Sequence, residues 1–309
     1  MGYRKYHDAL SIASRISMFS GSITALITPF TDRGAIDFSA LDGLVDFQLE
    51  NGTDGLAIIG TTGESATMDR DEIVAVMDRV IRRVDGRIPV MAGTGTAGTA
   101  HVIEQTQTAA DMGADAALVV TPYYNRPPQR GLEAHFTAVA DVSPIPLVLY
   151  NVPPRTGVDL LPETVERICD HPRIIGIKEA VGERERFAEL LRRCGPDFIV
   201  LSGDDPSCLQ SMKLGGQGVI SVASNVAPAL MHRLCAAALE QDWSSAEGLN
   251  EDLEPLFDAL ALESNPIPVK WAAYELKLAG PGIRLPLVEL DKNHRDRLRR
   301  VLEETGLAR

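Results

Sequence analysis

The sequence predicts an α/β fold, a (β/α)8 TIM barrel with appended C-terminal helices. Three observations support it. Short apolar runs rich in Val and Ile recur at intervals of about 25 to 35 residues, and a polar turn and a segment of helical periodicity follow each run. The runs are apolar on both faces, as in a parallel sheet covered by helices. There are eight of them, which close naturally into a barrel. An open, doubly wound sheet is the alternative.

The eight expected strands follow one another along the whole first part of the chain. They are SITALITPF (22–30), GLAIIG (55–60), IPVMAG (88–93), AALVVTP (116–122), IPLVLYN (145–151), IIGIKEA (174–180), FIVLSGD (198–204) and GVISVAS (218–224). Between strands, segments such as 70–84 and 100–112 carry the apolar spacing of about 3.6 residues that is typical of an outer helix.

The chain divides into three expected parts. Residues 1–18 form an N-terminal extension without the continuous apolar core and cleavage site of an export signal. Residues 19–225 hold the barrel strands and their connecting helices. Residues 226–309 are helical in pattern, broken by turns at 264–266 and 280–282. Because no strand signal returns there, we expect the last barrel helix and further helices packed on the barrel.

Composition narrows the class of ligand. The net charge of -13 opposes binding to nucleic acid or to an anionic membrane, since both require clustered cations. No run approaches the roughly 20 apolar residues of a membrane span. The four cysteines form no CxxC pair and the histidines are scattered, so we expect reduced thiols, a cytoplasmic location and no metal. A small molecule is the expected substrate.

Lys178 is the most informative single residue. It lies within IIGIKEA, the only expected strand that contains a lysine. Burial disfavours an ammonium and lowers its pKa, so that a free amine can attack a carbonyl and form an imine. The alternatives are that Lys178 extends to solvent or pairs with Glu179.

Other candidates follow from the rule that barrel chemistry lies at the carboxyl ends of the strands. Tyr150 ends the fifth strand with inward parity and should neighbour Lys178, where a phenol can transfer protons. Thr61 and Thr62 stand on the glycine-flanked turn GTTGES, which suits either a substrate carboxylate or a helix cap. Arg155, on the proline-stiffened loop NVPPRTG, offers a bidentate carboxylate contact.

One motif is discounted. Residues 93–98 match GxGxxG after a strand and before a helix, as in dinucleotide-binding folds. The following strand ends in Thr121-Pro122 instead of an acidic residue that would hold a ribose. We therefore interpret these glycines as a tight barrel loop and expect no cofactor.

Several ordered motifs resemble the dihydrodipicolinate synthase family of pyruvate-dependent class I aldolases, from about Phe19 to about Leu307. They are GTTGES (60–65), TPYYNRP (121–127), YNVPPRTG (150–157), GIKEA (176–180), LSGDD (201–205), GVISVASN (218–225) and NPIPVKWA (265–272). The resemblance implies a lyase of the diaminopimelate and lysine pathway that joins pyruvate to L-aspartate 4-semialdehyde.

The resemblance also implies roles for individual residues. Pyruvate would form an imine with Lys178, its carboxylate would lie at Thr61 and Thr62, and Arg155 would receive the carboxylate of the semialdehyde. The proton relay would use Tyr150, Thr61 and Tyr124, the last supplied by a neighbouring subunit. That arrangement implies a homodimer at least, commonly a homotetramer of two tight dimers. The remaining substrate-site positions are Gly203 and Ile220.

A regulatory site is less well matched. Family members inhibited by lysine bind it near the positions of Ser65, Ala66 and Tyr123. Further polar groups of those members align with Arg70, Ile73, Ala97 and His101. Here Ile73 and Ala97 offer no side-chain hydrogen bond, and His101 replaces an acidic partner. We hypothesise weak or absent feedback inhibition.

Two rival functions share this pattern. A sister aldolase acting on N-acetylneuraminate, a 2-keto-3-deoxy sugar acid or 4-hydroxy-2-oxoglutarate would use the same fold and lysine. Arg155 and the pair Tyr123-Tyr124 favour a short amino-acid aldehyde instead. A non-catalytic ligand-binding barrel should lack one of Lys178, Tyr150, Thr61 and Tyr124, and all four are present.

Overall fold

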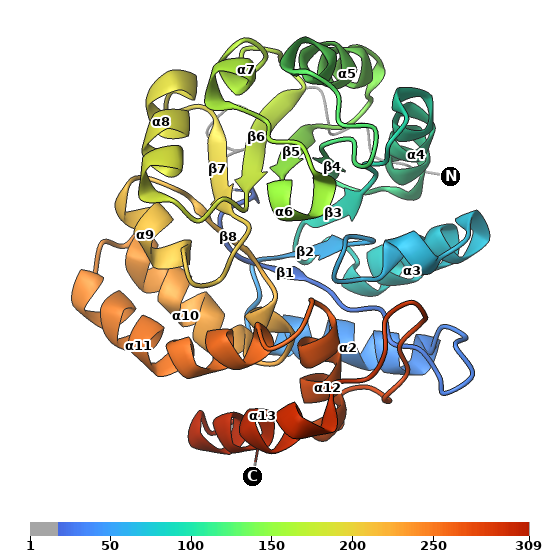
Figure 1. Ribbon diagram of the computed structural model, residues 1–309, viewed down its shortest axis with the longest axis vertical. Coiled ribbons are helices and arrows are strands. Elements are labelled where there is room, and N and C mark those ends of the chain that lie inside the picture. The colour runs from blue at the N-terminus through green and yellow to red at the C-terminus, as the bar shows by residue number, and fades with distance from the viewer. Residues whose placement is uncertain (1–17, 309) are drawn as a thin grey trace.

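The computed structural model describes residues 18–308, and the predicted N-terminal extension lies outside them apart from Met18. Eight parallel strands close into a barrel in the order β1 to β8 (Figure 1). They are β1 (Gly21–Ala25), β2 (Gly55–Ile58), β3 (Val90–Gly93), β4 (Ala116–Val120), β5 (Leu147–Asn151), β6 (Ile174–Glu179), β7 (Ile199–Ser202) and β8 (Gly218–Ser221). Pairing of β1 with β8 confirms the barrel and excludes the open sheet.

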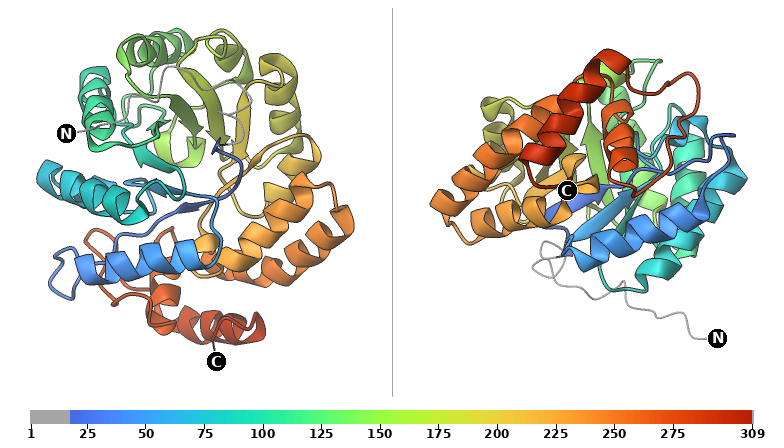
Figure 2. Two further views of the ribbon diagram at one scale, coloured as in Figure 1. Left: turned by 180° about the vertical axis from the view of Figure 1, so that it is seen from behind. Right: turned by 90° about the horizontal axis from the view of Figure 1, so that it is seen from below.

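Helices surround the barrel, and the C-terminal ones lie outside that ring (Figures 1 and 2). They are α2 (Phe38–Glu50), α3 (Arg70–Val84), α4 (Thr99–Met112), α5 (Gln129–Val142), α6 (Pro153–Thr156), α7 (Pro162–Glu166), α8 (Arg184–Cys194), α9 (Cys208–Lys213), α10 (Pro228–Leu239), α11 (Trp243–Leu260), α12 (Ile267–Glu275) and α13 (Lys292–Glu304), with short 3-10 turns at Ser65–Thr67 and Ala223–Asn225.

Local sequence explains where α3 begins. Asp69 accepts a hydrogen bond from the backbone N–H of Glu72, and the Glu72 side chain accepts one from the backbone N–H of Asp69, which is a capping box. Arg82 and Arg83 lie in the last turn, where cations interact favourably with the helix dipole. The helix spans the predicted range 70–84.

Several predicted strands are too long at their carboxyl ends. The first was expected to reach Phe30, but β1 ends at Ala25. Phe30 instead makes isolated bridges to Ile36 and Gly282, so the chain after β1 leaves the barrel to meet a C-terminal segment. Apolar composition could not separate this departure from a continuing strand, because both are buried.

The buried side chains form two cores. One lies inside the barrel and includes Ile23, Met91, Val148, Leu201 and Ile220. The larger one fills the space between the strands and the helices. Alternation along each strand assigns successive residues to one core or the other. Inward-facing residues at the carboxyl ends of the strands are therefore the ones that can meet a substrate.

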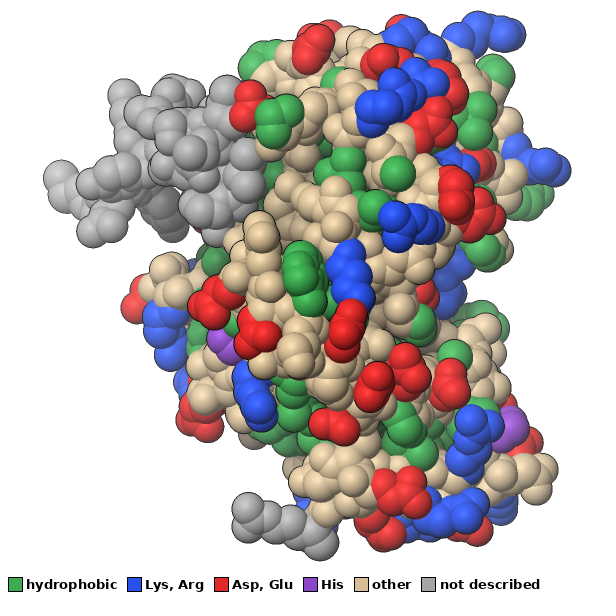
Figure 3. Space-filling view, turned by 90° about the vertical axis from the view of Figure 1, so that its left-hand side faces the viewer, with side chains coloured by type: hydrophobic (Ala, Val, Ile, Leu, Met, Phe, Trp, Pro, Cys, Tyr) green, Lys and Arg blue, Asp and Glu red, His purple; other side chains and the backbone are tan. Residues whose placement is uncertain are grey.

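Charged side chains of both signs lie on the surface. On the face shown in Figure 3, basic side chains are interspersed among acidic ones. Within residues 18–308, no helix combines the length and apolarity needed to cross a membrane.

Candidate active site

Lys178 and Tyr150 lie side by side at the carboxyl end of the barrel. They are paired in the register between β6 and β5. The Lys178 Nζ stands 4.3 Å from the centroid of the Tyr150 ring, and both side chains are buried. The structure thus places the predicted amine and phenol together.

The surroundings of Lys178 favour a free amine. The pKa of Lys178 is lowered to about 8, chiefly by burial; the Asp205 carboxylate opposes this shift and the Arg155 guanidinium contributes to it. Lys178 does not extend to solvent, because it is only 6% exposed. It does not pair with Glu179 either, since the Glu179 carboxylate accepts hydrogen bonds from Asn151 and from the backbone N–H of Val181. At neutral pH, a larger fraction of Lys178 is therefore unprotonated than of an exposed lysine.

Gly203 explains how Lys178 fits. A Cβ at this position would lie 2.9 Å from the Lys178 Cε and 3.0 Å from the Ala180 Cβ. Only glycine leaves the lysine side chain its present path across the end of β7.

The turn after β2 lies beside this pair. Burial raises the pKa of Tyr150 to about 12, while Arg155 and a hydrogen bond with Thr61 act in the opposite direction. The phenol therefore stays protonated at neutral pH and can donate. The Thr62 Oγ1 accepts a 2.9 Å hydrogen bond from the Asn265 Nδ2. Neither Thr61 nor Thr62 is a helix cap, because Glu64 and Asp69 are the N-cap residues of the two helical segments that follow.

Two adjoining cavities open at these residues. One of about 370 Å³ is lined by the predicted substrate positions Lys178, Tyr150, Thr61, Thr62, Arg155, Gly203 and Ile220. A second of about 470 Å³ shares Thr61, Tyr150 and Arg155 with it and continues to Ser65, Ala66 and Tyr123. Thr61, Tyr150 and Arg155 therefore lie where the cavity of Lys178 meets the cavity that extends to Tyr123.

Sequence reasoning missed two residues here. Asp205 lines the lysine cavity, and its Oδ2 accepts hydrogen bonds from the backbone N–H groups of Val222 and Ala223 at 3.0 and 2.9 Å. Asn265 was noted only as part of a turn, yet it bonds Thr62, and its backbone oxygen accepts a 3.3 Å hydrogen bond from Arg155. The motifs LSGDD and NPIPVKWA contained both residues, but neither lies near Lys178 in sequence.

Tyr124 does not join the site within one chain. Its side chain is 93% exposed, its φ of 74° is left-handed, and it lines neither cavity. Tyr123 is less exposed, and its hydroxyl lies 3.4 Å from the Thr96 Oγ1.

The predicted regulatory positions divide between two places. Ser65, Ala66 and Tyr123 line the 470 Å³ cavity, whereas Arg70 and His101 line a separate cavity of about 250 Å³; Ile73 lines both. Glu104 also lines the smaller cavity and forms a 2.6 Å ion pair with Arg70. Sequence reasoning overlooked Glu104, although it lies one helical turn after His101.

The glycines of the loop 93–98 serve close backbone contacts. A Cβ on Gly93 would lie 2.3 Å from the Ile59 carbonyl oxygen, and one on Gly95 would lie 2.3 Å from the Val120 nitrogen. This agrees with a tight barrel loop.

Among residues 18–308, no three His, Cys, Asp or Glu side chains are grouped so as to hold a metal ion.

The family model described as the dihydrodipicolinate synthetase family matches residues 18–305. The chain belongs to this family. The match covers nearly the whole extent predicted from the motifs. Membership makes the chain an enzyme of the class I aldolase type.

Individual relatives are similar over their full length. The 4-hydroxy-tetrahydrodipicolinate synthase of Stutzerimonas stutzeri is 51% identical, with 94% of this chain and 99% of that protein covered. The crystal structure of the chloride-inhibited dihydrodipicolinate synthase from Acinetobacter baumannii, complexed with pyruvate, is 45% identical with a TM-score of 0.92, covering 93% of this chain and 99% of that one. The enzyme from Cyanidioschyzon merolae with lysine bound is 38% identical with a TM-score of 0.91, covering 94% and 99%.

Proposed function

We propose that this chain is a 4-hydroxy-tetrahydrodipicolinate synthase, which condenses pyruvate with L-aspartate 4-semialdehyde through an imine on Lys178. The observation that carries the proposal is the buried Lys178 amine, with its pKa lowered to about 8, beside Tyr150 at the base of a cavity. Family membership and relatives named for this activity support it.

The first half-reaction activates pyruvate. The Lys178 Nζ attacks the keto carbon, and the resulting carbinolamine loses water to give the imine. Tyr150 donates and recovers the protons, helped by the Thr61 hydroxyl. Thr61 and Thr62 hold the pyruvate carboxylate. Loss of a methyl proton converts the imine into an enamine.

The second half-reaction forms the ring. The enamine carbon attacks the aldehyde carbon of the semialdehyde, whose carboxylate is held by Arg155. The amine of the same substrate then attacks the imine carbon, closes the ring and releases Lys178 as a free amine. Lys178 is thus regenerated.

The site is completed by a second copy of the chain. Tyr124 is too exposed to serve its own Tyr150 and Thr61, so Tyr124 of the partner subunit acts as the outer member of the proton relay. The assembly is a homodimer that doubles into a homotetramer, and the reaction takes place in the cytoplasm.

Borohydride reduction in the presence of pyruvate, followed by peptide mass mapping, tests the proposal. We expect one pyruvyl adduct on the peptide that contains Lys178, none in Lys178→Met, and turnover when L-aspartate 4-semialdehyde is added. No adduct on wild-type Lys178 would overturn the mechanism. An adduct without turnover would favour a sister pyruvate aldolase.

A further inference from the structure

A second pair of residues stands directly behind Tyr150 and Lys178. In the register between β5 and β6, Asn151 pairs with Glu179 immediately after Tyr150 pairs with Lys178. Because side chains alternate across a sheet, Asn151 and Glu179 point away from the barrel interior, toward the helices. Both are fully buried.

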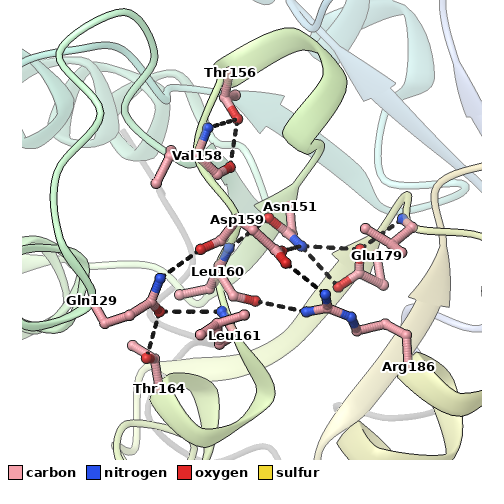
Figure 4. A network of polar contacts seen from close by, with 11 residues as sticks. Gln129, Asn151, Thr156, Val158, Asp159, Leu160, Leu161, Thr164, Glu179 and Arg186 are labelled. Carbon is pink, nitrogen blue, oxygen red and sulfur yellow. Dashed lines mark hydrogen bonds and ion pairs between the residues drawn. The ribbon is translucent and has the colours of Figure 1, made fainter.

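Asn151 uses all its hydrogen-bonding groups. Its Nδ2 donates to both carboxylate oxygens of Glu179, at 3.1 and 3.0 Å, and to the Asp159 Oδ1 at 2.8 Å. Its Oδ1 accepts from the backbone N–H of Leu160 at 2.9 Å. The Glu179 Oε1 also accepts from the backbone N–H of Val181 at 2.7 Å. Figure 4 shows these contacts converging between the two strand ends.

The network reaches the segment that carries Arg155. Asp159 follows α6, on which Arg155 lies, and its Oδ2 forms a 2.6 Å ion pair with Arg186 of α8. The backbone oxygen of Asp159 accepts a 2.7 Å hydrogen bond from Gln129 of α5. One asparagine therefore connects β5, β6 and the loop over the cavity.

Burying the polar pair Asn151 and Glu179 costs free energy, so stability alone does not explain it. Burial raises the pKa of Glu179 to about 7, against the hydrogen bonds from Val181 and Asn151 and the charge of Arg186. An apolar pair would fill this space without desolvating a carboxylate. Directional hydrogen bonds, however, restrict the relative position of two side chains more narrowly than apolar contacts do.

The backbone pairing of β5 with β6 is irregular at its start and continuous from Val148 to Asn151. Leu147 pairs with Ile174, but its neighbour Val148 pairs with Gly176, so the register between β5 and β6 shifts by one residue. A one-residue slip moves side chains to the opposite face of a sheet. The Asn151–Glu179 contact lies beyond the shift, next to Tyr150 and Lys178.

We propose that Asn151 and Glu179 are positioning residues for the reaction: they clasp the carboxyl ends of β5 and β6 so that Tyr150 stays beside Lys178, and through Asp159 they hold the Arg155 segment over the cavity. This inference rests on the proposed function, because the contact between Asn151 and Glu179, here called the clasp, positions residues for that reaction. It adds a specific requirement, that imine formation depends on two residues facing away from the substrate.

The test measures the rate of the borohydride-trapped pyruvyl adduct on Lys178 as a function of pyruvate concentration. Asn151→Asp sets a new carboxylate against those of Glu179 and Asp159. Glu179→Gln replaces one of the two oxygens that accept from the Asn151 Nδ2 with an amide donor. We expect each change to lower the limiting rate by roughly tenfold or more, because small misplacements of reacting groups slow reactions strongly. The half-saturating pyruvate concentration should change little, because Thr61 and Thr62 lie outside the clasp.

The double variant Asn151→Asp with Glu179→Gln sets an amide donor against the carboxylate introduced at position 151, but that carboxylate still faces the one of Asp159. We therefore expect the double variant to recover only part of the rate lost in Asn151→Asp. Thr24→Val is the matched control: Thr24 is a buried, outward-facing β1 residue whose hydroxyl donates to Gln48 at 2.7 Å. It should lose stability and keep the wild-type rate. All rates are measured where circular dichroism shows folded protein.

The outcomes separate the two proposals. No adduct on wild-type Lys178 overturns the proposed function and the clasp together. A wild-type adduct, with both single variants trapping pyruvate as fast as Thr24→Val, overturns the clasp alone. Slow trapping that the double variant does not relieve also contradicts the pairing.

Discussion

At the scale of single residues, chemistry at Lys178 follows from desolvation. The amine is buried on an inward-facing strand position, and the acidic groups near it reduce the shift without cancelling it. Tyr150 shows the complementary effect, since burial keeps its phenol protonated. One environment thus supplies a free amine and a proton donor at the same pH.

The rate of imine formation should therefore depend on pH through Lys178. Because its pKa is lowered to about 8, the protonated, unreactive form dominates below that value. We expect the rate to rise by about tenfold per pH unit up to pH 8 and then level off. Stopped-flow trapping between pH 6 and 10 measures this. A rise that continues toward the ordinary lysine pKa would contradict a desolvated amine.

At the scale of elements, helix faces decide which side chains share a cavity. Arg70 of α3 and Glu104 of α4 meet across the two helices, so the carboxylate in the 250 Å³ cavity is already paired. Ile73, which offers no side-chain hydrogen bond, and Gln105 line both this cavity and the larger one. The ammonium of a free amino acid would therefore meet a carboxylate that already has a cationic partner.

We accordingly expect L-lysine at submillimolar concentration to leave activity unchanged. His101→Glu adds a second carboxylate beside the paired Glu104 and should increase sensitivity to lysine. Steady-state turnover with and without lysine checks both statements, with His101→Gln as the control of equal size. Half-inhibition of the wild-type enzyme by submillimolar lysine would refute the hypothesis.

At the scale of the whole molecule, a buried ion pair joins the barrel to the C-terminal helices. Glu64, next to the Thr61-Thr62 turn, pairs with Lys270 of α12 and accepts a 3.0 Å hydrogen bond from the backbone N–H of Arg284. Lys270 and Arg284 both lie over the Phe30 ring: the Lys270 Nζ is 4.3 Å and the Arg284 Cζ 4.2 Å from the ring centroid. The C-terminal region thus anchors the turn that carries Thr61 and Thr62.

Glu64→Gln should lower the free energy of unfolding by about 3 to 5 kcal/mol, because Lys270 keeps a buried charge without its counter-ion. Glu64→Gln with Lys270→Met removes that charge and should regain most of the loss. Urea unfolding followed by circular dichroism measures both. A double variant as unstable as the single one would show that the ion pair is not the cause.

Subunit exchange tests the shared site. Lys178→Met and Tyr124→Phe should each be nearly inactive as separate proteins, the second by about 100-fold through loss of proton transfer. Mixed subunits create some sites with both native residues, so part of the activity should return on mixing. Mixing two samples of the same variant is the control. No recovery in verified mixed oligomers would argue against a tyrosine supplied by the partner subunit.

The sequence by itself determined the barrel and singled out its central lysine. Strand and helix periodicity are local properties, and a lysine within an apolar strand is visible without a structure. Tertiary structure alone decided that Asn265 bonds Thr62 across 203 positions, that Asp205 lies near Lys178, and that Glu179 faces Asn151 instead of Lys178. Such contacts join distant segments, and they depend on how loops and helices pack at the barrel end, which no local pattern encodes.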